Sequence, residues 1–180
     1  MTTTKPNYLF ASFLALLLAV TNIAYAESFE ENRKVSAFTR IEVGGLAHVE
    51  LIKGDKHQVE IWAKGIALND ILTKSTKDRL VVTTQGNHRG EKIRIQITYV
   101  ELEEIKTNGA AYIKATDAIT ANTLSIFITD NGDAVINLNV KNLHVDMRGN
   151  GNLTLKGLAK KQHIKSHGGG GSLNNTDLKN

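Results

Sequence analysis

Cationic and amide side chains recur at regular intervals in the second half of this chain. One series comprises Lys114, Asn137 and Lys156, and a second series at the same intervals comprises Lys106, Thr129, Arg148 and His167. Hydrogen-bond donors at a regular spacing suit anionic or hydroxyl-rich glycans. We therefore predict that Lys114, Asn137, Lys156 and Arg148 contact a ligand of this kind. A solvated polar face without a ligand would show the same pattern.

His144 and His163 are candidates for a metal site. Their separation in the sequence equals that of Asn137 and Lys156, so the two imidazoles would lie side by side in successive repeats. Imidazole is a common ligand of transition metals. A protein site needs three or four ligands, and only Asp146 stands close enough to contribute. A calcium-binding β-roll would need Gly-Gly-x-Gly-x-Asp in every repeat, and only residues 130–133 come near it. We therefore expect solvated histidines, no metal and no cofactor.

Residue types for catalysis are scarce. The chain has no cysteine, which excludes a thiol nucleophile, a disulfide framework and a zinc knuckle. Asp130 and Asp133 straddle one turn, as a pair of glycosidase carboxylates would, but no cleft is predicted around them. Ser125, His144 and Asp146 are the residue types of a Ser-His-Asp relay, but the sequence around the serine does not have the pattern of a nucleophile elbow. We expect no enzyme; the alternative is a polysaccharide lyase or hydrolase on the same scaffold.

Trp62 is the only tryptophan of the chain and stands in an alternating segment, 59–63. It points away from Ile61, and an outward indole offers a flat surface to a sugar ring. We include Trp62 among the predicted ligand contacts. The structural alternative is that the indole packs beneath a neighbouring loop.

An internal repeat positions most of these residues. Residues 124–138 (LSIFITDNGDAVINL) alternate around an Asn-Gly turn, and residues 143–155 (LHVDMRGNGNLTL) repeat the pattern. Gly132, Gly151 and Gly170 are evenly spaced. The predicted turn residues are Asn108, Gly109, Asn131, Gly132, Asn150, Gly151 and Gly170. A fixed period of about 20 residues that holds two short strands is typical of a β-solenoid.

This period predicts columns of inward side chains stacked about 4.8 Å apart. Three such columns are Ile105, Ile128, Met147 and Ser166; Ala111, Ala134, Leu153 and Ser172; and Ile113, Ile136, Leu155 and Asn174. The first turn, Asn108-Gly109, is further from the next turn than the later turns are from each other. We attribute this longer interval to an extra loop near residues 117–121. Asn108, Asn131 and Asn150 should also stack, so their amides can bond along the column.

The first half of the chain is less regular. Period-2 alternation predicts strands within residues 35–43, 47–51, 59–63, 80–84 and 93–99. Apolar residues at helical spacing predict one short helix over residues 66–73. We therefore expect an all-β fold: a short right-handed parallel β-helix (a β-solenoid), preceded by a set of strands with one short helix. Residues 35–180 are expected to form this domain, after a loose charged segment at 27–34.

Residues 1–26 have the pattern of a signal peptide. Lys5 precedes an apolar run over residues 9–20, and Ala24-Tyr25-Ala26 is a small-x-small cleavage site. This predicts an exported protein in the periplasm, at the cell surface or secreted, with no membrane span in the mature form. Residues 141–180 hold seven basic and two acidic residues, which can steer an acidic partner. We expect no nucleic-acid partner.

Three segments resemble a known family. Residues 33–44 (RKVSAFTRIEVG) and 49–54 (VELIKG) are similar to the start of the GIN domain, the head of putative auto-transporter adhesins in exported bacterial proteins. The later turn at 149–157 (GNGNLTLKG) is also similar. The resemblance covers about residues 35–173 and implies a parallel β-helix-like fold and an exported location, without catalytic residues. The series of repeats ends early by comparison, which suggests a short or truncated form.

The predicted function is non-catalytic binding at the cell envelope. The partner would be an anionic glycan or an envelope protein, held on outward solenoid faces. Besides the enzyme, a structural alternative stays open, in which copies associate through an uncapped C-terminal strand edge.

Overall fold

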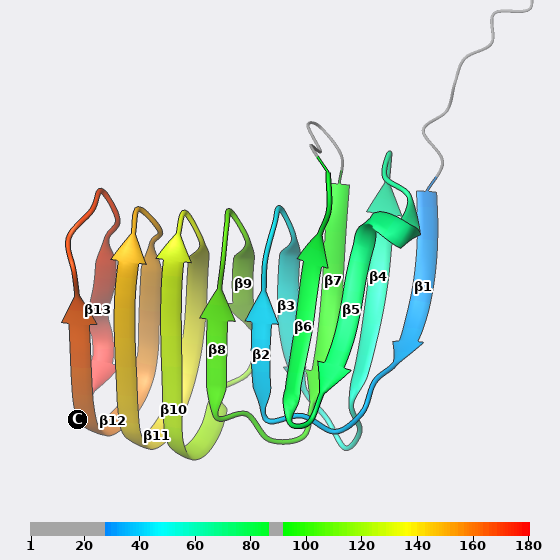
Figure 1. Ribbon diagram of the computed structural model, residues 1–180. Helices are drawn as coiled ribbons and strands as arrows, with labels where there is room; N and C mark the ends of the chain where they lie inside the picture. The colour runs from blue at the N-terminus through cyan, green and yellow to red at the C-terminus, as the bar shows by residue number, and fades with distance from the viewer. Residues whose placement is uncertain (1–27, 87–91) are drawn as a thin grey trace, which may run out of the picture.

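The chain is described by a computed structural model that covers residues 28–86 and 92–180. Its 13 strands belong to one continuous hydrogen-bonded sheet, which confirms the predicted all-β class (Figure 1). The strands are β1 (Ser28–Lys34), β2 (Arg40–Val43), β3 (His48–Lys53), β4 (Gln58–Lys64), β5 (Ile71–Thr76), β6 (Arg79–Thr84), β7 (Lys92–Tyr99), β8 (Glu104–Thr107), β9 (Tyr112–Ala115), β10 (Ile119–Asp130), β11 (Asp133–Gly149), β12 (Leu153–Ser166) and β13 (Leu173–Lys179).

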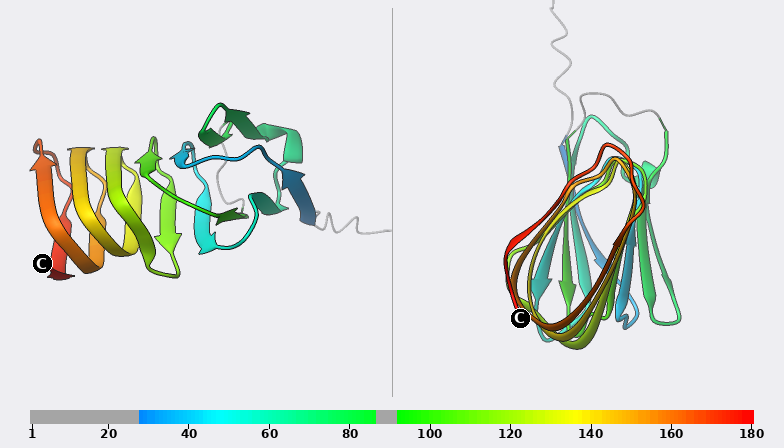
Figure 2. Two further views of the ribbon diagram at one scale, coloured as in Figure 1. Left: turned by 90° about the horizontal axis from the view of Figure 1, so that it is seen from below. Right: turned by 90° about the vertical axis from the view of Figure 1, so that its left-hand side faces the viewer.

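The sheet curls back on itself, so that two layers enclose the core. In Figure 1 the front layer contains β5, β6, β2, β8 and the C-terminal part of β10, and the back layer contains β1, β4, β7, β3 and β9. β10, β11 and β12 are long strands that bend from one layer into the other. Seen from the end in Figure 2, their successive turns lie over one another as a flattened ring.

The sheet is mixed, which the sequence did not predict. All pairs among β8 to β13 are parallel, as are those of β2 and β3 with their neighbours. Three pairs at the N-terminal end are antiparallel: β1 with β4, β4 with β7, and β5 with β6. The set of strands that was expected before the parallel coils, whose pairing the sequence left open, is therefore partly antiparallel.

The order of the strands in space differs from their order in the chain. β2 pairs with both β6 and β8, and β3 pairs with both β7 and β9. The β2–β3 unit thus lies between two units that follow it in sequence. The pattern of apolar residues is the same in all three units, so alternation alone could not reveal this insertion.

The sequence repeat sets the register of the central strands. Leu124 lies beside Leu143 and Ile126 beside Val145, and β11 pairs with β12 at the same offset. Within each layer, the inward side chains of neighbouring strands form continuous rows. One row in the front layer comprises Leu80, Ile41, Ile105, Ile126, Val145 and Ile164. All but Ile164 are buried, and burying one such side chain contributes about 1.5–3 kcal/mol.

The predicted register is wrong in the coil before the repeat. Ile105 pairs with Ile126 and not with Ile128, and Ile113 pairs with Ala134 and not with Ile136. This coil is therefore shorter than the spacing of the turns had indicated. Thr107 takes the place beside Ile128 that we had given to Ile105, and it is fully buried.

The last coil is one residue longer than predicted. Leu153 pairs with Leu173 and not with Ser172, and a bulge follows between Thr154 and Lys156. Leu173 packs against the core, whereas Ser172 and Asn174, which we had placed inward, are exposed. The predicted turn position Gly170 is likewise shifted, because Gly171 lies over Gly151.

The corners of the central coils explain the Asn-Gly sequences. A Cβ on Gly151 would lie 1.9 Å from the carbonyl oxygen of Gly132, so only glycine fits where the two turns stack. The Asn150 amide donates to Oδ1 of Asn131 at 3.3 Å, and its own oxygen accepts from the backbone N–H of Gly170 at 2.7 Å. The predicted asparagine ladder is confirmed for this pair. Asn108 instead donates to Glu42 of the neighbouring unit.

Two local predictions in the first half are wrong. Residues 66–73 form only a 3₁₀ turn, η1 (Leu68–Asp70), after which β5 pairs with β6. The segment expected to be loose forms β1, which pairs with β4. The Arg33 guanidinium donates to the Leu68 carbonyl at 3.0 Å and to Thr73 Oγ1 at 2.9 Å, and these bonds anchor β1. The predicted signal peptide falls outside the described residues.

Candidate functional site

The five predicted ligand contacts lie in separate places. Asn137 and Lys156 are direct neighbours on β11 and β12 in the back layer, as predicted. Lys114 is not in line with them, because it lies between Glu50 and Val135. Lys156 approaches Asp177 at 3.8 Å. These three residues therefore do not form one cationic column.

Arg148 lies in the front layer and is already engaged. Its guanidinium donates to both carboxylate oxygens of Asp146 at 2.9 Å, and His167 Nε2 lies 3.3 Å from the same carboxylate. The hydrogen bonds from Arg148 lower the pKa of Asp146 below its ordinary value. In the predicted series, Arg148 lies beside Thr129 as expected, but Lys106 lies beside Phe127.

The histidine pair is adjacent as predicted. His144 and His163 are cross-strand partners with ring centroids 6.0 Å apart. In residues 28–86 and 92–180, no group of three or more metal-ligating side chains comes together. Two imidazoles alone do not complete a metal site.

The carboxylates considered for catalysis stabilise turns. Asp130 accepts a hydrogen bond from the backbone N–H of Gly109 at 3.1 Å. Asp133 accepts from the backbone N–H of Asn152 at 2.6 Å and from its amide at 3.0 Å. Ser125 and His144 are cross-strand neighbours, but the part of the chain that the structure describes shows no hydrogen bond between them.

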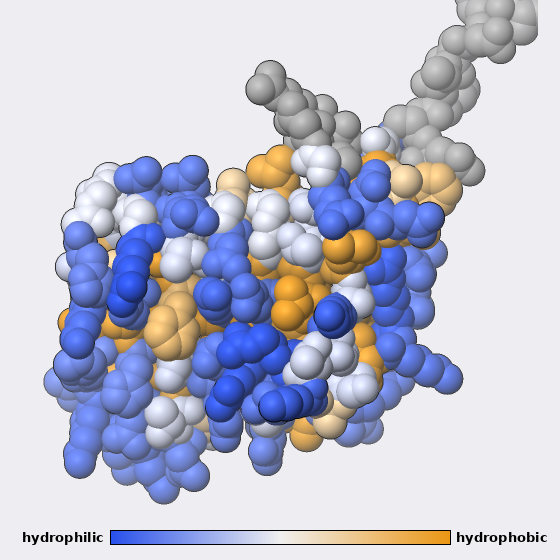
Figure 3. Space-filling view, in the orientation of Figure 1, coloured by the Kyte–Doolittle hydropathy of each residue, from blue (hydrophilic) through white to orange (hydrophobic). Residues whose placement is uncertain are grey.

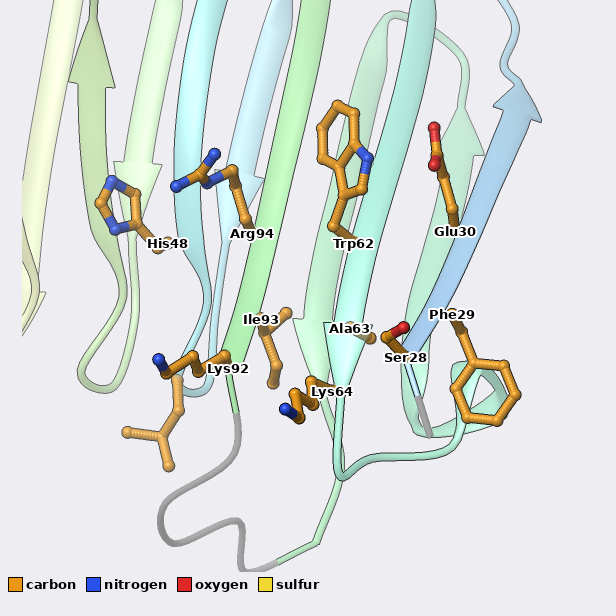
Figure 4. Close-up of a pocket in the computed structure, with 11 residues that line it drawn as sticks. Ser28, Phe29, Glu30, His48, Trp62, Ala63, Lys64, Lys92, Ile93 and Arg94 are labelled. Carbon is orange, nitrogen blue, oxygen red and sulfur yellow. The ribbon is translucent and has the colours of Figure 1, made fainter. Parts of the chain in front are cut away.

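Trp62 lines a hollow in the back layer, and Arg148 lines a smaller one, of about 510 Å³ with Phe127, in the front layer. The neighbours of Trp62 on β4, Ile61 and Ala63, are buried, so strand alternation turns the half-buried indole outward. We call the recess beside this indole the Trp62 hollow; its volume is about 700 Å³ (Figure 4). Besides the indole, its polar lining includes Glu30, His48, Lys64, Lys92 and Arg94.

Four strands contribute one row of outward side chains to this hollow. Glu30 of β1 pairs with Trp62, Trp62 with Arg94 of β7, and Arg94 with His48 of β3. Figure 4 shows these side chains projecting side by side from their strands. The row continues to Tyr112 of β9, whose ring meets that of His48 edge-on at 4.7 Å. Neighbouring strands are about 4.8 Å apart, so the row presents flat and charged groups at that step.

A second row of the Trp62 hollow is strongly cationic. Lys64 of β4 lies directly opposite Lys92 of β7, and Arg94 is on the same face of β7 at the next outward position. All three side chains are exposed. Among the described residues none of the three has an ion-pair partner, so this part of the chain leaves the hollow with a positive side.

The front layer is hydrophilic in a different way. Polar side chains gather over β8 and β2 in Figure 3. Arg79 lies 2.7 Å from Glu104 and 3.5 Å from Glu42, and Lys106 lies 3.3 Å from Glu42. The cations there are neutralised by neighbouring carboxylates. The Trp62 hollow differs, because no described carboxylate lies within ion-pair distance of its cations.

Sequence reasoning found Trp62 but missed its neighbours. Arg94 follows Ile93 in a clear alternation, which predicts that it points outward. That Arg94 lies beside Trp62 depends on the antiparallel pairing of β4 with β7. Alternation within one strand does not reveal which other strand pairs with it. The cluster of Trp62 and Arg94 could therefore not be predicted from the sequence pattern alone.

The Trp62 hollow combines an indole face with cations on one side and the Glu30 carboxylate on the other. A ligand with a flat apolar face and polar edges fits such a surface.

The family described as "putative auto-transporter adhesin, head GIN domain" matches residues 37–180. This chain belongs to the GIN-domain family. The resemblance drawn from residues 33–54 and 149–157 is thereby confirmed. No curated protein matches the sequence.

Three solved structures have a similar fold. The chain resembles a putative adhesin of Bacteroides fragilis with a TM-score of 0.75 and 21% identity, over 84% of this chain and 72% of that one. A putative lipid binding protein of Parabacteroides distasonis gives 0.68 and 14%, over 84% and 74%. A putative adhesin of the same species gives 0.65 and 18%, over 85% and 75%. At these identities the similarity shows the fold alone.

A search of the described residues finds no helix with the length and apolar character needed to cross a bilayer.

Proposed function

We propose that this GIN-domain protein is an exported, non-catalytic envelope protein that binds glycans in the Trp62 hollow. Family membership supports an adhesin-like role and export. The predicted signal peptide at residues 1–26 supports release into the periplasm or beyond it.

The observation that carries the proposal is the placement of Trp62. A half-buried indole beside a hollow of about 700 Å³ is a large apolar surface next to water. The C–H face of a sugar ring can cover that surface, while Arg94, His48 and Glu30 offer donors and acceptors to its hydroxyl groups. The volume is in the range of small-ligand sites.

Of the five predicted contacts, we propose only Trp62 as a ligand contact. Arg148 is bonded to Asp146, and Lys156 lies near Asp177. Lys114 and Asn137 are not aligned with each other. Arg148 also lines a hollow, of about 510 Å³ with Phe127 in the front layer, but its guanidinium is already bonded to Asp146. Arg94, beside Trp62, has no ion-pair partner among the described residues.

We also propose that residues 101–180 form a short right-handed parallel β-helix that serves as a rigid extension of the domain. The parallel pairs and the constant register of β10, β11 and β12 support the coil. Its rigidity follows from the stacked turns, which leave little freedom at their corners.

Removal of the indole tests the function. We expect Trp62→Ala to lose retention on immobilised envelope polysaccharides, with affinity reduced roughly tenfold or more. Phe127→Ala is a matched control, because Phe127 is also half-buried and outward but lies in the front layer. Equal binding by wild type and Trp62→Ala, or no binding of any glycan by wild type, would refute the proposal.

A further inference from the structure

We infer that the ligand of the Trp62 hollow is an acidic sugar, a ring that carries a carboxylate. The inference rests on the proposed glycan binding and adds the chemical class. It assigns the ring to Trp62, the carboxylate to the cations of β4 and β7, and a hydroxyl group to Glu30.

The cation arrangement is the first argument. Lys64 and Lys92 are direct partners on antiparallel strands, where like charges destabilise the pair. Arg94 adds a third positive charge on the same face. The described residues supply no carboxylate within ion-pair distance of these three groups. A bound anion would relieve the repulsion, and a guanidinium binds a carboxylate through two parallel hydrogen bonds.

The position of Glu30 is the second argument. Glu30 is the partner of Trp62 on the side opposite Arg94. A polyanion that continued past the indole toward β1, as a long single-stranded nucleic acid would, would bring phosphates toward this carboxylate, whereas an acidic oligosaccharide that ends on Trp62 does not. A sugar hydroxyl group donates to Glu30 instead. The hollow is therefore polarised, with an acceptor on one side of the platform and anion-binding donors on the other.

The direction of the row is the third argument. Trp62, Arg94, His48 and Tyr112 follow one another across four strands at steps of about 4.8 Å. A pyranose unit is similar in length to one step. An acidic oligosaccharide can thus extend from Trp62 toward Tyr112 across the strands.

The fluorescence of Trp62 gives a direct readout because it is the only tryptophan in the chain. We would titrate the mature protein with oligogalacturonate, a neutral oligoglucan of equal length, oligo(dT) and anionic phospholipid vesicles. The expected result is a saturable change with oligogalacturonate, roughly tenfold tighter or more than with the neutral glycan. At about 1 M salt, where the Debye length is about 3 Å, this preference should shrink.

Lys92→Glu separates binding from folding. The change replaces a like-charge pair with an opposite-charge pair, so the thermal midpoint should stay equal or rise while oligogalacturonate affinity falls about tenfold or more. Arg94→Gln should lose a similar factor. Lys179→Glu is the matched control, an exposed cation of β13 outside the hollow, and should bind as wild type.

The outcomes distinguish the two proposals. Equal affinity for acidic and neutral glycans, or full oligogalacturonate binding by folded Lys92→Glu, would overturn the acidic class and leave glycan binding standing. Tighter binding of oligo(dT) or vesicles than of oligogalacturonate would overturn both, if calorimetry, used because this variant has no tryptophan, shows that binding is lost in Trp62→Ala. If none of the four probes changes the fluorescence of Trp62, both proposals are also overturned.

Discussion

The C-terminal coils and the N-terminal strands of this molecule both enclose an apolar core, but their strands are paired differently. From β10 to β12 the chain repeats one coil, every pair is parallel, and the register is constant. From β1 to β7 the pairs are mixed, and one unit is inserted between two others. The regular part is a scaffold, and the Trp62 hollow lies in the irregular part.

Buried polar groups show the same difference. Four buried side-chain atoms of the described residues have no hydrogen-bond partner, and they belong to His57, Ser75, Tyr99 and Thr107. All four precede β10. In the repeated coils even the exposed turn amides of Asn131 and Asn150 are bonded to each other, because like residues stack on like. The irregular N-terminal strands have no repeated neighbours to bond in this way. Their pairing is, however, what brings Glu30, Trp62 and Arg94 together.

The largest expected effect is at a corner of the regular coils. Gly151→Val should destabilise the protein by roughly 3–5 kcal/mol, because its Cβ meets the Gly132 carbonyl oxygen at 1.9 Å and backbone cannot move aside. The midpoint of urea unfolding measures this. Gly168→Ala is the control: no atom lies within 4 Å, and only its φ of +81° opposes alanine, at about 1–2 kcal/mol. Similar losses for both variants would contradict the stacking of the corners.

An intermediate effect tests the shifted register of the last coil. Leu173→Ala should cost about 1–2 kcal/mol, since the side chain is partly buried against the core. Ser172→Ala should cost less than about 1 kcal/mol, since Ser172 is exposed and loses only the hydrogen bond from its hydroxyl to Asn152 Oδ1 at 2.7 Å. If the register predicted from the sequence were correct, Ser172 would point inward. Ser172→Ala would then be stabilising, and Leu173→Ala would be neutral.

These particular residues also show what the sequence could and could not reveal. The offset of the central coils was predictable because Gly132 and Gly151 must stack. Leu173 was misplaced because consecutive glycines at 168–171 allow either Gly170 or Gly171 at the corner. The helix expected at 66–73 is absent because Ile66 and Ile71 are buried equally well by a turn and a strand. The site was half predictable: Trp62 is conspicuous, but Arg94 is its neighbour only through a pairing that no local pattern encodes.

A smaller effect concerns the irregular part at high pH. Burial, and to a lesser degree the charge of Asp117, raises the pKa of Tyr99 to about 12. Since the folded state holds this proton more tightly, its contribution to stability is complete below the ordinary pKa of 10.0 and is lost as the pH rises toward about 12. Ultraviolet absorbance of tyrosinate should show one group titrating late.

Tyr99→Phe is the matching variant. It should remove the late titration at little cost at neutral pH, because the hydroxyl has no hydrogen-bond partner among the described residues. Ionisation of every tyrosine near the ordinary pKa would contradict the burial.

The most direct measurement of the division between scaffold and site is a ¹H–¹⁵N spectrum of the labelled mature protein during titration with oligogalacturonate. The chain has one indole N–H, that of Trp62, so its signal is assigned at once. We predict that this signal and the amides of Arg94 and His48 shift together, while those of Gly132 and Gly151 stay in place. Shifts confined to Asn137 and Lys156, or an indole signal that never moves, would contradict the account.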